Sequence, residues 1–379
     1  MPRTRRPTFP ALLAGALLLL AGCSPLAGLR PPPASALEAA LSGRALLGRP
    51  VRPEALPRID PFALDERLEA LAADLAARHP EAWPRARALH AALLQPPHLG
   101  GRGLRYDAAA PTLPAAEAYR LGRVNCLSYS LLYVALARRA GLDAALNDVE
   151  PPPSWDLRDD DTLLRLRHVN AKLRLGRRDE LVVDLDMARY RPEYPQRRLA
   201  DREATALFHA NRALEIAAAG DEAGAFLHLR RALDLDPANP HLWNNLGNLY
   251  LRHGRRGEAE AAYFRGLALA PSDPTLLVNL ANLYAAAGRH ADAARLETRL
   301  RRYRERNPYH LYARARAALA AGALEDAHTA VTRALDVGGD RDPRILELAA
   351  RIQRALGREA RAARYERLAR ELDAASPTP

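Results

Sequence analysis

The sequence has 379 residues but only two cysteines, Cys23 and Cys126, and a single lysine, Lys172. Two cysteines cannot supply the framework of several disulfides that holds small secreted domains together. Aromatic residues are also scarce, at 6% of the chain against 48% for all hydrophobic residues. This composition favours helices rich in Ala and Leu over an aromatic-rich sheet. We therefore expect a mainly helical protein, which at this length has two or three domains.

The charge is strongly unbalanced, because the formal net charge of +11 comes almost entirely from arginine. Such an excess can mark a protein that binds nucleic acid or anionic lipid head groups. The arginines, however, are scattered among Glu and Asp through helical patterns and do not cluster with interleaved aromatic residues. This distribution is typical of a solvated helical surface, so nucleic acid is not expected among the partners.

The N-terminus has the pattern of an export signal. Several arginines precede an apolar run over residues 9–22, which is too short to span a bilayer and is typical of a secretory signal. The run ends in LAGC, residues 20–23, which resembles the lipobox of bacterial lipoproteins. The resemblance implies a signal peptide over residues 1–22, cleavage before Cys23 and a diacylglycerol on its sulfur. An ordinary signal with an incidental cysteine is the alternative.

The residues after the lipobox bear on localisation. Ser24, not aspartate, follows Cys23, which by the same resemblance implies the bacterial outer membrane, facing the periplasm; the inner membrane and the cell surface are the alternatives. A lipidated Cys23 cannot form a disulfide, so Cys126 is expected to be the only free thiol of the mature chain. Residues 23–57 are rich in Pro, Ala and Gly and are expected to form a tether from the anchor.

Helical periodicity begins after the tether. From Asp60 the stretch LDERLEALAADLAARH repeats leucine at three- and four-residue steps, and Pro80 ends it. A second helix is expected over residues 83–94. We place these helices at the start of a domain that extends over residues 58–200.

Three motifs of this domain carry candidate chemistry. NCLSYSLLYVALARRAGLDA places Cys126 at the start of an apolar helix, and LRHVNAKLRL and DELVVDLDM follow it with strand-like alternation. In this order they resemble the nucleophile helix, histidine strand and acid strand of the transglutaminase-like superfamily. The resemblance covers residues 104–190 and implies a papain-like α+β fold with Cys126, His168 and Asp184 as catalytic residues. The separation of 16 positions between His168 and Asp184 is usual in that family.

Physical chemistry gives these three residues compatible roles. A helix N-terminus stabilises a thiolate through its partial positive charge and free N–H groups. A histidine supplies an ion-pair partner and general acid, and a carboxylate fixes its tautomer. The expected reaction is acyl transfer through a thioester at Cys126, with the backbone N–H of Cys126 as one oxyanion donor. Water or an amine could be the acceptor, so hydrolysis and crosslinking both stay open. Taken alone, each residue is more typical of a structural role.

The choice of acid depends on the register of a hairpin. On alternation, His168 shares a face with Asn170 and Lys172, and both Asp184 and Asp186 are candidates on the return strand. A turn over residues 175–177 places Asp184 directly across from His168, whereas a turn one residue later places Asp186 there. Turn chemistry does not decide between the two. The family spacing favours Asp184.

The segment between the cysteine and histidine motifs contains PPPSWDLRDDD, which includes Trp155. A Pro-rich stretch with many charges is typical of a surface loop, and we expect one here. The alternative is that this loop, with Trp155, covers the cleft of the candidate catalytic site.

From residue 201 a repeat appears. PHLWNNLGNLYLRHGRRGEAEAAYFRGLALAP starts at Pro240, and a similar stretch starts 34 residues later at Pro274. This period and the packing positions of the first copy resemble the tetratricopeptide repeat; those positions are Trp243, Leu246, Gly247, Tyr250, Ala259, Tyr263 and Pro271. The resemblance implies an all-α solenoid of about five helix pairs over residues 201–376, in which stacking buries a core that no single pair could bury.

Asparagines recur in step with the repeat. Asn211, Asn245 and Asn279 are spaced by 34 residues, and Asn248 and Asn282 lie three positions after the last two. An Asn side chain can donate to and accept from a peptide backbone, so these positions are candidates for binding a protein or peptide in the solenoid groove. The alternative is that they tighten contacts between repeats.

Together these patterns predict a membrane-anchored cysteine acyltransferase or peptidase with a partner-binding solenoid. The sequence contains no motif that predicts a cofactor or a metal site. The alternative is a non-catalytic scaffold or assembly lipoprotein, in which the transglutaminase-like fold has become structural.

Overall fold

The computed structural model describes residues 28–151, 154–156, 162–164, 168–176, 179–185 and 190–375. Helices α1 to α16 dominate these residues, and the strands are short, so the prediction of a mainly helical protein is confirmed. None of the helices in this part of the chain is long and apolar enough to cross a membrane. The predicted signal peptide and Cys23 lie outside the described residues.

A small α+β unit contains the three motifs of the predicted site. Its sheet has the order β7-β6-β3-β8, with antiparallel neighbours throughout. The strands are β3 Asp143–Val149, β6 His168–Arg174, β7 Glu180–Val183 and β8 Gln196–Arg198. Helix α6, Cys126–Arg139, packs against β3 and β6. A small sheet with one central helix agrees with an α+β unit, while the finer resemblance to a papain-like domain stays a prediction.

Helix α6 is the centre of this unit because its sequence is apolar on every side. All residues from Leu127 to Ala137 are buried, as expected for a helix surrounded by protein. Three further helices cover it: α3 Glu66–Arg78, α4 Ala82–Leu94 and α5 Ala115–Leu121. The first two agree with the helices expected from the leucine spacing. α3 begins later than Asp60 because the side chain of Asp65 accepts a hydrogen bond from the N–H of Leu68 and caps the helix.

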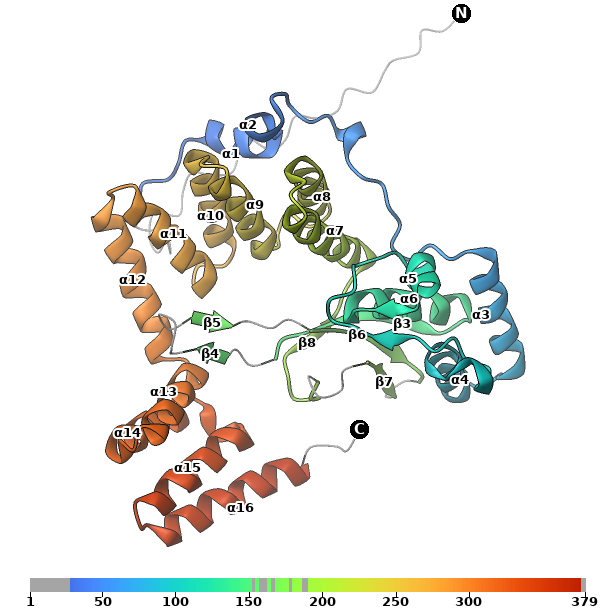
Figure 1. The fold of residues 1–379 in the computed structure, drawn as a ribbon. Helices are drawn as coiled ribbons and strands as arrows, with labels where there is room; N and C mark the ends of the chain where they lie inside the picture. The colour runs from blue at the N-terminus through green and yellow to red at the C-terminus, as the bar shows by residue number, and fades with distance from the viewer. Residues whose placement is uncertain are drawn as a thin grey trace, which may run out of the picture.

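Residues 28–57 do not form the expected tether. They contain two helices, α1 Ala34–Ser42 and α2 Arg44–Leu47, which pack on the solenoid (Figure 1). Ala40 is fully buried there, and its carbonyl accepts a 2.6 Å hydrogen bond from the Tyr250 hydroxyl. Gly43 joins the helices at φ +70°, where a Cβ would lie 2.4 Å from the Phe226 ring. The apolar spacing of ALEAAL outweighs the Pro-rich composition around it.

Ten helices from residue 201 form five antiparallel pairs, as the 34-residue period predicts. They are α7 Asp201–Ala218, α8 Glu222–Leu235, α9 Pro240–Arg252, α10 Arg256–Leu269, α11 Pro274–Ala286, α12 His290–Glu305, α13 Pro308–Ala320, α14 Leu324–Asp336, α15 Pro343–Ala355 and α16 Glu359–Ala375. Six of the seven expected packing positions are buried, among them Trp243, Tyr250 and Tyr263, and Pro271 is half-buried. Gly247 permits this packing, because a Cβ there would lie 2.3 Å from the ring of Tyr263.

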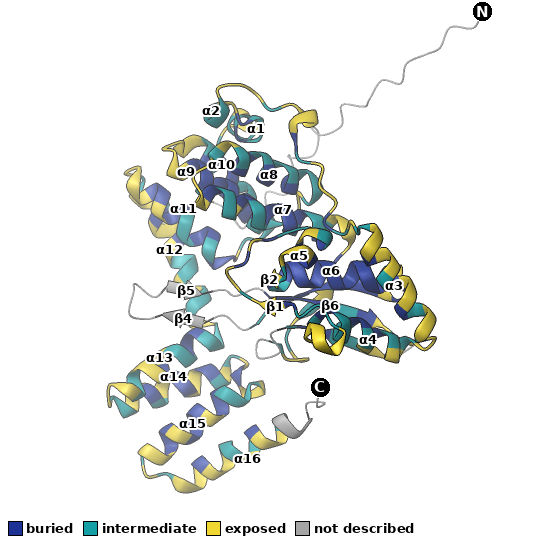
Figure 2. Cartoon of the chain, turned by 45° about the vertical axis from the view of Figure 1, so that its right-hand side comes forward, coloured by how far each residue is buried: buried dark blue, intermediate teal, exposed yellow. Residues whose placement is uncertain are grey.

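The buried residues, which are dark blue in Figure 2, form three hydrophobic clusters. The cluster of the α+β unit includes Ala204 and Phe208 of α7, so the first solenoid helix belongs partly to that core. A second cluster joins α1 to helices α7 to α12, and a third lies within α13 to α16. The solenoid core is therefore interrupted between α12 and α13.

Candidate functional site

Cys126 is the first residue of α6, as the sequence predicts, and its thiol is free and partly exposed. Asn125 caps the helix, because its side-chain oxygen accepts a 2.8 Å hydrogen bond from the N–H of Ser128. The amide nitrogen of Asn125 donates to the carbonyl of Ala110 and to the hydroxyl of Thr112, at 3.0 Å each. The sulfur therefore lies at the positive end of a firmly held helix.

His168, the first residue of β6, is buried at 2% exposure and contacts the other two predicted residues. Its Nε2 lies 2.5 Å from Oδ2 of Asp184. Burial alone would lower the pKa of His168, but hydrogen bonds to Asp184 and Cys126 outweigh burial and raise that pKa to about 9. Since Nε2 contacts Asp184, Nδ1 is the ring nitrogen left to contact the thiol. The three residues thus form a thiol–imidazole–carboxylate cluster.

A second donor holds the carboxylate. Nδ2 of Asn170, which is fully buried, lies 3.1 Å from Oδ2 of Asp184. Strand alternation predicts that Asn170 shares a face with His168, but it predicts no role for Asn170. The signal that could have identified it is its position, two residues from the histidine on the same strand and hence on the same face.

The hairpin register differs from the one expected for a His168–Asp184 pair. β6 and β7 pair Ala171 with Val183, which is the later of the two registers and sets Asn170, not His168, across from Asp184. His168 reaches Asp184 diagonally, because neighbours two positions apart on one face lie within side-chain reach. Asp184 therefore contacts His168 from this diagonal position and not by direct pairing across the hairpin. Asp186 lies outside the described residues.

The segment between β3 and β6 contains a small hairpin whose strands, β4 Ser154–Asp156 and β5 Thr162–Leu164, pair antiparallel. β4 lies beside α13 of the solenoid (Figure 1), so the described part of this segment contacts the solenoid and is not a free surface loop. The side chain of Trp155 is not described. No sequence pattern near Trp155 could have indicated a helix more than 150 residues away.

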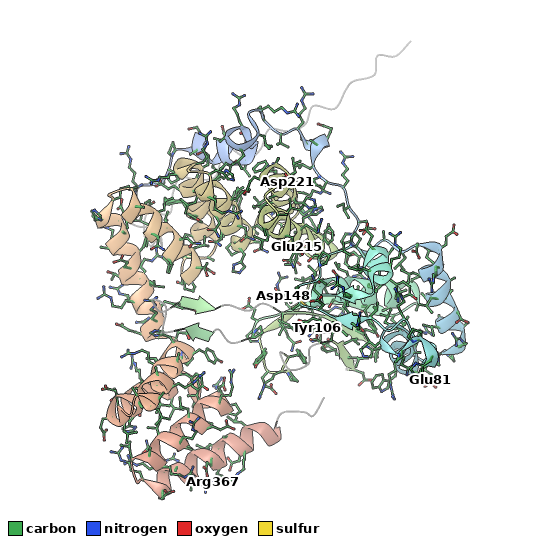
Figure 3. The ribbon with its side chains drawn as sticks, viewed as in Figure 1. Glu81, Tyr106, Asp148, Glu215, Asp221 and Arg367 are labelled. Carbon is green, nitrogen blue, oxygen red and sulfur yellow. The ribbon has the colours of Figure 1, made fainter. Side chains whose placement is uncertain are left out.

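The solenoid braces the start of α6. Oε1 of Glu215, on α7, accepts a 2.8 Å hydrogen bond from the backbone N–H of Thr112, and Thr112 is the fully buried residue whose hydroxyl binds Asn125. Figure 3 shows Glu215 where α7 meets the α+β unit. Arg212 holds the same carboxylate at 2.8 Å through Oε2. A continuous chain of hydrogen bonds therefore runs from the first solenoid helix to the helix that carries Cys126.

Replacing Glu215 with alanine is expected to loosen this chain, because the buried N–H of Thr112 loses its acceptor at a cost of about 1–3 kcal/mol. We expect faster hydrogen exchange at the amides of Thr112 and Ser128, measured by mass spectrometry or NMR. Glu215→Gln keeps an acceptor oxygen and should restore most of the protection. Glu258→Ala, on α10, serves as a control for a solenoid glutamate outside the chain. Unchanged exchange in Glu215→Ala would contradict the bracing role.

Two of the repeated asparagines bind each other rather than facing an open groove. Nδ2 of Asn279 donates to Oδ1 of Asn244 at 2.7 Å and lies 3.3 Å from Oδ1 of Asn248. The Tyr263 hydroxyl also donates to Asn248, at 2.6 Å. For Asn248 and Asn279 these contacts favour the alternative in which Asn tightens neighbouring repeats.

Three of the five asparagines stay candidates for a ligand. Asn282 is exposed, and Asn211 and Asn245 are half-buried. Their side chains have no hydrogen-bond partner within the described part of the chain. The prediction that they bind a peptide therefore stays a prediction.

Comparisons with known proteins bear on the solenoid. The family model for the tetratricopeptide repeat matches residues 217–276. None of the curated proteins matches the chain. Similar solved structures include MamA from AMB-1, at 20% identity over 46% of this chain and 94% of that chain with a TM-score of 0.24. They also include PilF from Pseudomonas aeruginosa, at 16% identity over 46% of this chain and 78% of that chain, with a TM-score of 0.26. A third is the type IV pilus biogenesis factor PilW, at 24% identity over 45% of this chain and 79% of that chain, with a TM-score of 0.25. The family match and the five helix pairs together identify tetratricopeptide-type repeats in this chain.

Proposed function

We propose that this chain is a partner-binding protein whose solenoid recruits a protein or peptide. The observation that carries the proposal is the stack of tetratricopeptide-type helix pairs, since solenoids of this kind present extended concave surfaces for binding. A cavity of about 350 Å³ between α11, α12 and the start of α13 suggests the chemistry of the partner. Arg299, Arg302 and Arg306 line it, and none of the acidic residues that the structure describes does. A partner that presents carboxylates would complement this charge.

Binding of an acidic peptide tests this proposal. A fluorescent peptide of eight glutamates should bind the full chain, and the change Arg302→Glu with Arg306→Glu should weaken binding at least about tenfold because it replaces attraction with repulsion. Arg351→Glu with Arg361→Glu, on α15 and α16, is the control for the same change of net charge elsewhere. Asn245→Ala with Asn282→Ala in the same assay tests the asparagine prediction. Equal affinity of both charge-reversed variants for the glutamate peptide would count against binding at the arginine-lined cavity.

A second candidate function, cysteine acyl transfer, is favoured by the contacts of His168 with Cys126 and Asp184. On this proposal the thiolate of Cys126 attacks a carbonyl carbon, and the N–H groups at the start of α6 stabilise the oxyanion. The imidazolium of His168 gives its proton to the departing amine, and a thioester forms on the sulfur. Water or a second amine then attacks the thioester and releases the product. The competing hypothesis remains a non-catalytic transglutaminase-like fold.

The rate at which Cys126 is alkylated at pH 7 separates these two hypotheses. His168, with a pKa of about 9, is a cation at pH 7 and can hold an ion pair with a thiolate. Because this pKa lies above the ordinary value of 6.5, the ion pair of His168 with Asp184 stabilises the fold fully below about pH 6.5 and less as pH rises through 9. We expect iodoacetamide to alkylate Cys126 about tenfold faster at pH 7 than a model thiol, and His168→Gln to remove this advantage. A rate equal to that of the model thiol would favour the scaffold.

The anchor belongs to the same proposal. We propose that a lipid on Cys23 holds the chain at the outer membrane on the periplasmic side, supported by the LAGC motif of residues 20–23. Mass spectrometry of the N-terminal peptide from cells would test it, since an unmodified Cys23 would contradict it.

A further inference from the structure

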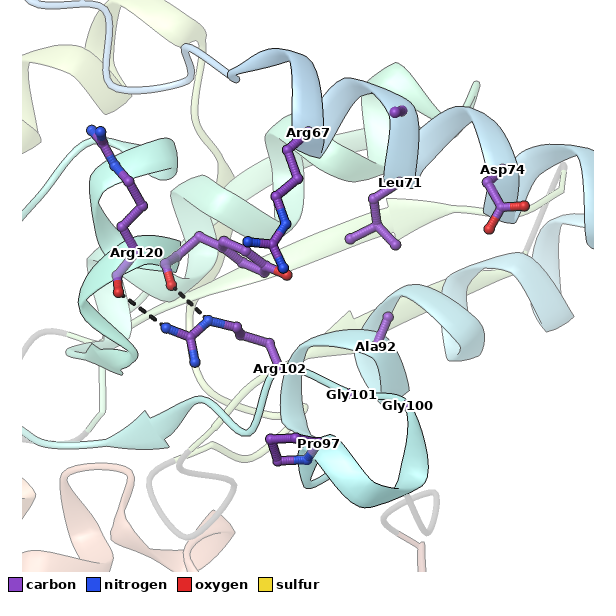
Figure 4. Close-up of a pocket in the computed structure, with 11 residues that line it drawn as sticks. Arg67, Leu71, Asp74, Ala92, Pro97, Gly100, Gly101, Arg102 and Arg120 are labelled. Carbon is purple, nitrogen blue, oxygen red and sulfur yellow. Dashed lines mark hydrogen bonds between the residues drawn. The ribbon is translucent and has the colours of Figure 1, made fainter.

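A cavity of about 730 Å³ lies on the α+β unit between α3, α5 and η2, a short 3-10 helix at Pro97–Leu99 (Figure 4). Its volume is in the range typical of small-molecule sites. Neither Cys126 nor His168 lines it, so it is separate from the candidate catalytic cluster.

Two guanidinium groups define the cavity chemically. Arg67 of α3 and Arg102, which follows η2, each lie 5.5 Å from the centre of the Tyr119 ring. Arg102 is fixed, because its Nε donates to the carbonyl of Tyr119 at 3.2 Å and its Nη2 to that of Arg120 at 3.0 Å (Figure 4). Gly122 leaves room for it, since a Cβ there would lie 3.2 Å from Nη2. Nη1 of Arg102 forms no hydrogen bond within the described residues.

The described residues do not balance the charge of this cavity. Within the described residues, neither Arg67 nor Arg102 forms an ion pair with a carboxylate. Asp74 also lines the cavity, but its carboxylate is paired with Arg78. Two cations that share one ring and lack a counter-ion attract an anion, and a guanidinium group binds oxyanions through two parallel hydrogen bonds.

The walls narrow the class of anion. Leu71, Ala92 and Pro97 add apolar side chains to the lining, which suits a ligand with a non-polar part next to its charged group. A phosphate offers more acceptor oxygens than a carboxylate, so two guanidinium groups can bind it at once. We propose that this cavity binds the phosphate group of a small ligand, either a soluble phosphate ester or a phospholipid head group.

Binding of inorganic phosphate to the full chain tests the site directly. At constant ionic strength, phosphate should raise the melting temperature, whereas acetate should not. Arg67→Gln should lower phosphate affinity by about tenfold or more, because a charge-assisted hydrogen bond contributes about 1.5–3 kcal/mol. The control is Arg87→Gln, since Arg87 also stacks on an aromatic ring, that of Trp83 at 5.9 Å, but lies outside the cavity. Equal phosphate affinity in the two variants, or equal stabilisation by acetate, would overturn the proposal.

Further experiments test the role of Arg102 and identify the source of the phosphate. Arg102→Lys keeps the charge but loses the planar fork, and it should also weaken phosphate binding; binding as strong as in the wild type would count against the role of Arg102. Co-sedimentation with phosphatidylcholine vesicles that do or do not contain phosphatidylglycerol identifies a lipid source if it depends on Arg67. Binding of glycerol 3-phosphate that depends on Arg67, without such vesicle binding, identifies a soluble ester. Dependence on Arg67 in neither arm would contradict the site.

Discussion

Replacing Cys126 with alanine is expected to abolish labelling by a thiol-directed acyl electrophile and to leave the melting temperature nearly unchanged. Labelling requires a nucleophilic sulfur, and in a mature chain that begins with the proposed lipidated Cys23, Cys126 is the only free thiol. The fold should tolerate the change because Cys126 is partly exposed at a helix start and alanine has the highest helix propensity. Intact-protein mass spectrometry and thermal unfolding would measure the two effects.

The control for this experiment is Ser128→Ala, two residues further along α6. Ser128 accepts a hydrogen bond from the N–H of Leu113 at 2.9 Å, so its loss should cost stability while the thiol remains reactive. The two variants therefore have opposite expected outcomes. A Cys126→Ala protein that fails to fold, together with a wild type that never labels, would make Cys126 a core residue and exclude acyl transfer.

Asp184→Asn is expected to lower any acyl-transfer rate by about 10⁴-fold, the size of effect seen when a triad carboxylate becomes an amide. The amide cannot balance the charge of an imidazolium, so the pKa of His168 should fall from its raised value. An amide nitrogen facing Nε2 would also favour the wrong histidine tautomer. Single-turnover acylation at several pH values, with NMR titration of His168, would measure both effects.

The matched control is Asp186→Asn, which should cost little, since the carboxylate that lies 2.5 Å from His168 is that of Asp184. Asp179→Asn provides a second control, because Asp179 is exposed in the same hairpin. The pH profile separates catalysis from folding, since a merely structural loss would reduce the amplitude of acylation without moving the pKa of His168. A larger rate loss at Asp186 than at Asp184 would exclude the proposed roles.

The sequence alone determined the features that depend on near neighbours along the chain. A tetratricopeptide-type pair packs mainly on the pairs next to it, so the 34-residue period contains enough information to predict five pairs. The helix that starts at Cys126 was equally predictable, because Asn125 caps it locally and its apolar run needs a buried position. The order of the three motifs likewise indicated which cysteine, histidine and acid to compare.

Only the tertiary structure decided which distant elements meet. The diagonal contact of Asp184 with His168 depends on a register that turn residues did not specify. The packing of residues 34–47 on the solenoid and the hydrogen bond from Thr112 to Glu215 each join segments about 100 residues or more apart. No local pattern encodes such contacts, because their energy comes from surfaces that form only once the separate helices and sheets have packed together.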